Sequence, residues 1–244
     1  MSLLGFQRAL ADMVGSPNLA RAVRAGDDVL TAYDLTPKDR ARLEVVAAQR
    51  GMEVNCTLYR TNRLTPVVML LPYTCFLLGD RMKWIAERFW GDRKTDLQFR
   101  GEIERFAAFL RELLESGELV EPLLQEILAF ELATNDLRFA PRRQIERCIA
   151  NNVGSGISLH PLVRLVRFRH DPTHLLELLS DMEPPPYELA EGDFPVVLVA
   201  GSEELEVRRI HPHLASLLEA LEHSETIDAD DADLLVDAGL AARA

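Results

Sequence analysis

Apolar residues recur at helical spacing through the first half of the chain. In residues 101–116 they occupy positions i, i+3, i+4 and i+7, namely Ile103, Phe106, Ala107, Leu110, Leu113 and Leu114. Residues 119–134 repeat this spacing, beginning at Val120 and Leu123. Each segment predicts an amphipathic helix that buries one face, because short helices gain most of their stability from such packing.

Three shorter helices are predicted before this pair, over residues 2–14, 17–25 and 37–50. Ser16 and Thr36 stand just before the second and third of them. Each is followed by a proline, which is the usual order of an N-cap and a first helical residue. We therefore expect a helical bundle from the N-terminus to about residue 150.

The most apolar run of the chain, residues 54–90, is interrupted by polar groups and by prolines. Pro66 and Pro72 punctuate it and Gly79 marks a stop, so we expect a central helical hairpin. The polar residues are Tyr59, Arg60, Asn62 and Arg63. They either satisfy backbone groups where Pro66 breaks helical hydrogen bonding, or form a surface on which the arginines anchor a partner's carboxylates. The sequence leaves both interpretations open.

After a turn-rich run at residues 151–156, the pattern changes from helical to strand-like. The predicted elements are a strand at 162–169, a helix at 171–182, strands at 194–200 and 205–210, and a helix at 211–222. The last two strands flank a short turn and form a predicted hairpin. Pro195 cannot donate a ladder hydrogen bond, which favours an edge strand or the start of a strand.

The predicted fold class is α+β, with an N-terminal helical bundle over residues 1–150 and a small βαββα domain over residues 151–244. The two parts differ in charge. The first holds 21 acidic and 21 basic side chains and the second holds 18 and 6, so the whole net charge of −12 lies in the second. Nucleic-acid binding depends on cationic neutralisation, so we expect no nucleic acid among the partners.

The N-terminus, MSLLGFQRALADMV, lacks the basic start and the cleavage site of a signal peptide. No run reaches the roughly 18 uninterrupted apolar residues of a membrane span. We therefore expect a cytoplasmic protein with no membrane partner. The three cysteines, Cys56, Cys75 and Cys148, form no C-x-x-C pair, and buried thiols are the simplest expectation for them in a reducing compartment.

Recognisable catalytic and metal-binding motifs are absent from the sequence, which has no G-x-S-x-G, no Walker loop and no dinucleotide fingerprint. His211 and His213 are separated by one residue, and His170 and His174 span a proline at a predicted helix start. Neither pair has the i, i+4 geometry of a helical zinc site. We expect no catalytic residue, no metal site and no cofactor in this chain.

Several motifs occur in an order that resembles a bacterial family whose N-terminal domain is named for DNA binding. The first half of the resemblance rests on Tyr59-Arg60-x-Asn62, Pro72, Leu77-Leu78-Gly79 and an aromatic helix to Phe89. The second half rests on His160-Pro161, Val163-Arg164-Leu165 and Pro184-Pro185-Pro186, followed by a hairpin and a final helix. The similarity covers about residues 40–220, and residues 1–40 are longer and more divergent than the family pattern.

Proteins of this family are typically encoded beside multinuclear non-haem iron-dependent oxidases, of which the methanobactin-biosynthesis pair is the best-known type. The resemblance implies a non-catalytic partner subunit that forms a heterodimer with the oxidase. In this role the chain presents the leader of a ribosomally made precursor peptide for oxidative modification. The resemblance also implies that the iron belongs to the oxidase and that this chain holds no metal.

Two surfaces follow from this resemblance. The expected oxidase interface is formed by Tyr59, Arg60, Asn62 and Arg63. A small sheet with a free edge can capture an extended leader by strand addition, and the available strands are 194–200 and 205–210. The expected peptide-binding residues are Arg167, Val197, Val199, Val207, Arg208 and Arg209. The arginines would select acidic or carbonyl groups, while the acidic domain would favour a leader with basic residues.

Two other functions stay open on the sequence alone. One is a DNA-binding regulator that uses the C-terminal part as a winged-helix-like unit. The other is a stand-alone enzyme whose site the sequence does not reveal. The neighbouring genes would separate the oxidase partner from both alternatives.

Overall fold

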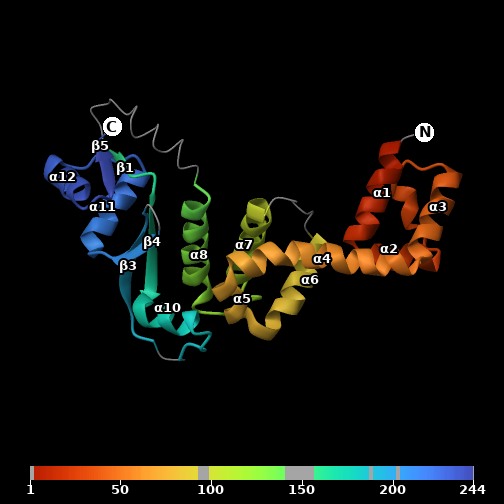
Figure 1. Ribbon diagram of the computed structural model, residues 1–244, viewed down its shortest axis with the longest axis horizontal. Coiled ribbons are helices and arrows are strands. Elements are labelled where there is room, and N and C mark those ends of the chain that lie inside the picture. The colour runs from red at the N-terminus through yellow and green to blue at the C-terminus, as the bar shows by residue number, and fades with distance from the viewer. Residues whose placement is uncertain (1–2, 93–98, 141–156, 187–188, 202–203, 244) are drawn as a thin grey trace. The chain divides into compact units, whose positions relative to one another are not determined.

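The computed structural model describes the following residues: 3–92, 99–140, 157–186, 189–201 and 204–243. The protein is mixed helix and strand, as the sequence predicts (Figure 1). The turn-rich run that was expected to connect the two domains, and Cys148 before it, lie outside the described residues.

The chain forms two compact units. The first unit is drawn from residues 1–69 and 79–113, and the second from residues 70–78 and 114–244. This division differs from the boundary expected near residue 150. Two helices that the sequence analysis placed in the helical bundle pack with the C-terminal sheet instead.

Helices make up the described part of the first unit. They are α1 (Leu3–Gly15), α2 (Pro17–Ala25), the 3-10 helix η1 (Asp28–Ala32), α3 (Pro37–Ala48), α4 (Arg50–Leu70, to residue 69), the 3-10 helix η2 (Gly79–Arg81), α6 (Met82–Asp92) and α7 (Phe99–Glu115, to residue 113). Ser16 and Thr36 accept the backbone N–H of Leu19 and Asp39, both at 3.2 Å, so both predicted N-caps are confirmed.

Apolar contacts among the described residues stabilise these helices. One cluster joins α1, α2 and α3 to the first turns of α4 through buried residues that include Met13, Leu43 and Cys56. Further contacts surround Phe89 of α6, whose ring lies edge-on to Phe106 of α7 with a centroid distance of 5.3 Å. Burial of large apolar side chains of this kind is the main stabilising contribution to a helical domain.

The helix α4 continues through Pro66, so the expected interruption at that proline is wrong. The helix ends four residues later, and Pro72 begins α5 (Pro72–Leu78). At a first helical position the missing N–H has no intrahelical partner to lose, so Pro72 fits there without cost. Gly79 follows with φ 49°, a left-handed conformation that glycine adopts readily, and the predicted stop at this residue is confirmed.

The second unit contains α5, α8 (Leu124–Arg138), β1 (Ile157–Leu159), β2 (Val163–His170), α10 (Pro172–Ser180), β3 (Glu191–Ala200), β4 (Leu205–Arg209), α11 (Pro212–Glu222), α12 (Ala229–Asp237) and β5 (Ala241–Arg243). The order β2, α10, β3, β4, α11 is the predicted βαββα arrangement. The strands β2, β3 and β4 form an antiparallel sheet in that order, and β1 pairs with β5 in a small second sheet that the sequence did not indicate.

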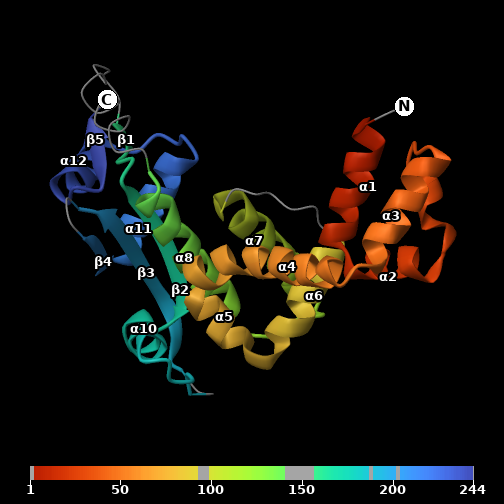
Figure 2. The same cartoon turned by 45° about the vertical axis from the view of Figure 1, so that its right-hand side comes forward.

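Helices cover both faces of the three-stranded sheet (Figures 1 and 2). On one face, Val166, Phe168 and Leu198 pack against α8 and α10. On the other, Val163 and Val197 pack against α11 and α12. Side chains on a strand alternate between faces, so the apolar run of β3 fills both layers.

Two buried polar side chains of α8 fix the start of α5. Glu131 accepts the backbone N–H of Tyr73 at 2.7 Å and that of Thr74 at 2.9 Å, and Asn135 Nδ2 donates to the Leu70 carbonyl oxygen at 2.6 Å. The helix is interrupted between α4 and α5, which would leave these two N–H donors and this carbonyl acceptor unpaired. The bonds from Glu131 and Asn135 satisfy them. Burial raises the pKa of Glu131 to about 7.

Candidate functional site

The strand β4 forms one edge of the three-stranded sheet, with β3 on its inner side. Ile210 N donates to Pro195 O at 3.1 Å and Gly201 N donates to Glu204 O at 3.0 Å, so even-numbered residues of β4 point their backbone groups toward β3. An antiparallel strand alternates its backbone groups from one side to the other. The N–H and C=O groups of Leu205, Val207 and Arg209 therefore point to the open edge.

The side chains beside this edge are apolar at one end and cationic at the other. Leu205 packs against the core cluster that includes residues of α8, and Val207 next to it is 44% exposed. At the far end, the guanidinium of Arg209 lies over the ring of Phe194, with 4.6 Å to the ring centroid. The predicted positions Val207 and Arg209 thus lie on the open edge, together with Leu205, which sequence reasoning missed.

Val197 and Val199 do not lie on an edge, because β3, one of the two strands that were expected to be available, is the central strand. Val197 pairs with Leu165 of β2 on one side and Arg208 of β4 on the other, and its side chain is fully buried. Val199 is likewise paired on both sides and packs near α11. Both valines stabilise the sheet and cannot receive a peptide strand.

Pro195 is tolerated inside this central strand for a local reason. Its carbonyl oxygen accepts from Ile210, just after β4 ends at Arg209. In a strand, the nitrogen and the carbonyl oxygen of one residue face the same side. The absent N–H of Pro195 therefore faces a position beyond the last residue of β4, where no ladder bond is lost.

Arg167 is already occupied by two carboxylates. It donates from Nε and Nη2 to Glu219 of α11 at 2.6 and 2.9 Å, and from Nη1 to Asp193 of β3 at 2.7 and 2.9 Å. These bonds lower the pKa of Glu219, since hydrogen bonding to Arg167 favours the charged form. Arg167 therefore joins β2 to α11, and the prediction that it contacts a peptide is wrong.

Arg208, also expected to bind the peptide, has a more distant carboxylate neighbour, with 3.6 Å between its Nε and Glu206.

The four residues expected at the oxidase interface differ in their surroundings. Arg63 is buried, its Nε donates to Glu102 at 2.6 Å and its guanidinium lies over Phe89. Its side chain is not available to a partner, and it pairs with a carboxylate instead of with backbone groups near Pro66, so neither of the two expected roles describes this residue.

The other three members of that set lie nearer the surface. Arg60 is half-buried with its guanidinium over the ring of Trp90, 5.2 Å from the centroid, and Asn62 is exposed. Tyr59 is half-buried, and its ring lies against Gly15 at the end of α1. Arg60 and Asn62 therefore remain candidates for contact with another protein, with Tyr59 in a partly packed position beside them.

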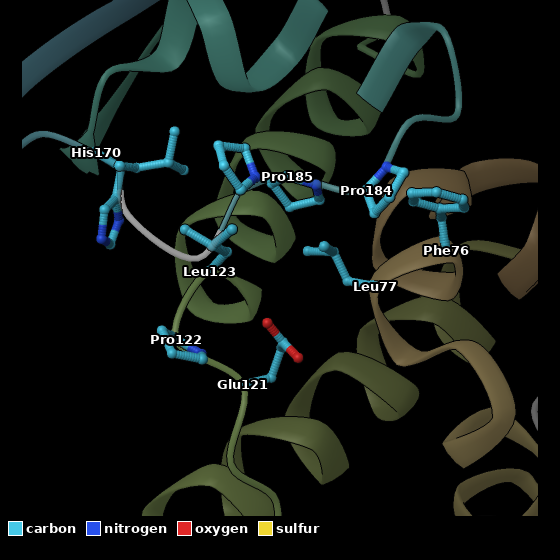
Figure 3. Close-up of a pocket in the computed structure, with 10 residues that line it drawn as sticks. Phe76, Leu77, Glu121, Pro122, Leu123, His170, Pro184 and Pro185 are labelled. Atoms are coloured by element: carbon cyan, nitrogen blue, oxygen red, sulfur yellow. The ribbon is translucent and has the colours of Figure 1, made fainter. Parts of the chain in front are cut away.

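A pocket of about 350 Å³ in the second unit was not indicated by the sequence (Figure 3). Its walls are mostly apolar and come from α5, the start of α8 and the proline run, including Phe76, Leu77, Leu123, Pro184 and Pro185. The ring of His170 lies at one side and is held by Glu126, with 2.5 Å between Nδ1 and the carboxylate oxygen. The Pro-Pro-Pro run is the one sequence signal that could have drawn attention to this wall.

The two described cysteines differ in exposure, since Cys56 is buried and Cys75 is half-buried. Burial raises the pKa of Cys75 to about 12, helped by the carboxylate of Glu131, and burial also raises the pKa of Cys56. Within the described residues, no group of three or more His, Cys, Asp and Glu side chains is placed to hold a metal ion. Among the described helices, none combines the length and apolar character needed to cross a membrane.

No protein-family model matches this chain, and no curated protein matches it. The family resemblance of the sequence motifs therefore stays a prediction.

Proposed function

We propose that this chain is a non-catalytic partner subunit that captures the leader of a ribosomally made precursor peptide on the open edge of β4. In this proposal it presents the peptide to a multinuclear non-haem iron-dependent oxidase, which holds the iron. The partner oxidase and the class of precursor come from the resemblance of the sequence motifs. The open edge of the sheet supports β4 as the place of capture.

The observation that carries the proposal is the row of outward backbone groups on Leu205, Val207 and Arg209. An edge strand with unpaired N–H and C=O groups is a template for another strand, and proteins usually block such an edge. In the described part of the chain, β4 carries no proline and pairs only with β3. Strand addition supplies affinity through main-chain bonds and selects the peptide through alternate side chains.

The flanking side chains favour a particular leader sequence. A peptide residue beside Val207 would meet an apolar surface, and residues two apart along the peptide lie on the same side. The guanidinium of Arg209 lies at one end of that side, and carboxylates pair well with arginine. We therefore expect apolar residues at alternate positions of the leader, followed by an acidic residue near Arg209.

The DNA-binding alternative finds little support in the second unit. In a winged-helix-like arrangement, α11 would be the element that enters the major groove. Its sequence, PHLASLLEALE, has no Lys or Arg and includes Glu219, which pairs with Arg167. Duplex recognition relies on arginine and lysine for both phosphate and base contacts, so this helix is poorly suited to it.

Fluorescence anisotropy with a labelled leader tests the proposal. Val207→Pro removes one outward N–H, and we expect it to weaken leader binding by about tenfold or more, since the lost bond and the altered strand together exceed about 1.4 kcal/mol. Val207→Ala trims the side chain but keeps the N–H, and serves as the matched control. Equal affinity in a folded Val207→Pro variant would place the peptide elsewhere.

A further inference from the structure

A second pocket, of about 250 Å³, lies in the first unit between α2 and α4. Its walls include the apolar side chains of Ala20, Met52 and Cys56. Three arginines also line it, namely Arg21, Arg24 and Arg60. A pocket that combines apolar walls with several guanidinium groups has the composition of a site for a side chain with an apolar stem and an anionic end.

Only one of the three arginines has a carboxylate partner among the described residues. Arg24 donates to Glu53 at 2.7 Å and to the Ala47 carbonyl oxygen at 3.0 Å. Arg21 donates to Asn18, which is neutral, at 2.8 Å.

Arg60 is held over the ring of Trp90, and its buried Nε has no hydrogen-bond partner among the described residues. Among the described residues that line the pocket, Glu53 is the one carboxylate. The three arginines therefore give the lining a net charge of two positive.

We propose that the pocket between α2 and α4 binds the carboxylate of a glutamate side chain from an acidic segment of a partner protein. Arg21 and Arg60 would share the carboxylate, because a guanidinium matches its planar, two-oxygen geometry. The methylene groups of the glutamate would lie against Met52 and Ala20, which a bare inorganic anion would leave exposed to water. The site does not depend on capture of a leader at β4.

Three threonine hydroxyl groups along α4 already have hydrogen-bond acceptors within the helix. Thr57, Thr61 and Thr65 each donate to the carbonyl oxygen four residues earlier, at 3.0, 3.0 and 2.9 Å. A partner that covers this face therefore leaves none of these hydroxyl donors without a bond. Val54 and Leu58, both more than half exposed, lie on the same helix as these threonines.

The test is a titration of the full chain with an acetylated tetraglutamate peptide, followed by the NMR signals of the arginine side chains. The Nε–H signals of Arg60 and Arg21 are expected to shift together. Arg21→Glu is expected to weaken binding by about tenfold, which corresponds to one lost charge-assisted hydrogen bond. Arg42→Glu makes the same charge change on α3, at a side chain that is 60% exposed, and is expected to alter the affinity less than about twofold.

Three outcomes overturn the proposal. Equal losses in Arg21→Glu and Arg42→Glu would mean that the peptide responds only to overall charge. Equal binding of tetraglutamine would mean that the carboxylate is not recognised. Inorganic phosphate that produces the same shifts with equal affinity would define a general anion site. Leader binding at β4 is measured separately, so failure of this site and failure of the proposed function are distinguishable.

Discussion

The guanidinium of Arg63 and the carboxylate of Glu102 form a buried ion pair, with 2.6 Å between Nε and Oε1, although the two residues are 39 positions apart. Both side chains are at least 95% buried. Removing one member of such a pair leaves a charge without compensation, which typically costs about 3 to 5 kcal/mol. The pair therefore anchors α4 to α7 within the first unit.

Arg63→Met is accordingly expected to lower the free energy of unfolding by about 3 to 5 kcal/mol, because Glu102 stays buried and loses its ion pair with Arg63. The double variant Arg63→Met, Glu102→Leu is expected to recover much of that loss, because both buried charges are gone. Urea denaturation measures both. A surface ion pair contributes at most about 1 kcal/mol. If Arg63→Met changed the free energy of unfolding by no more than this, the burial of the pair would be contradicted.

Arg167 is predicted to stabilise the second unit rather than to bind the leader. Its side chain is one-third exposed, so the expected loss of stability in Arg167→Ala is only about 1 to 2 kcal/mol. The affinity for the leader is expected to stay within about twofold of wild type, measured by anisotropy on the folded variant. If the variant kept its stability but no longer bound the leader, Arg167 would belong to the peptide-binding site.

Glu131 is expected to make stability depend on pH. Its pKa is raised from 4.5 to about 7 in the folded chain, mainly by burial, so the folded state favours the neutral carboxyl. This contribution is fully present below pH 4.5 and is lost as the pH rises through about 7. At about 1.4 kcal/mol per pKa unit the change is on the order of 3 kcal/mol.

The comparison with Glu131→Gln isolates this contribution, since other titrating groups are common to both proteins. The difference in unfolding free energy between wild type and variant is expected to change between pH 4.5 and about 7, with wild type losing relative stability as the pH rises. Chemical denaturation at several pH values gives that difference. A constant difference would show that the carboxyl has the same pKa in the folded and unfolded chains.

Cys75 is expected to resist alkylation in the folded chain. With a pKa of about 12 instead of 9.0, its thiolate fraction at about pH 8 is lower by about a thousandfold, and the thiolate is the reactive form. Iodoacetamide labelling mapped by mass spectrometry, in native buffer and in urea, measures the ratio of rates. Comparable labelling of Cys75 in both conditions would contradict its raised pKa in the folded chain.

The elements that sequence analysis predicted correctly depend on local chemistry. Asp171 caps the start of α10 by accepting the backbone N–H of Thr173 at 3.0 Å, and the hairpin of β3 and β4 follows from two strands around a short turn. Signals of this kind involve residues only a few positions apart. Such local signals can therefore be recognised in the sequence without knowledge of the long-range packing.

The errors concern relationships between distant segments. The order β2-β3-β4 buries Val197 in a central strand, and no local pattern specifies that order. Arg63 looked like a surface anchor because its partner lies on another helix. Arg167 looked free for the same reason, with Glu219 52 residues away. Long-range pairing decides which charged residues are available, and a single sequence does not show it.

The most direct measurement of leader capture is amide hydrogen exchange along β4, resolved by residue. In the free chain, the outward amides of Leu205, Val207 and Arg209 are expected to exchange fast, while those of Glu206 and Arg208, which point to β3, exchange slowly. Addition of the leader is expected to slow the three outward amides and leave the other two nearly unchanged. A leader that binds without slowing the outward amides would contradict capture at the edge of β4.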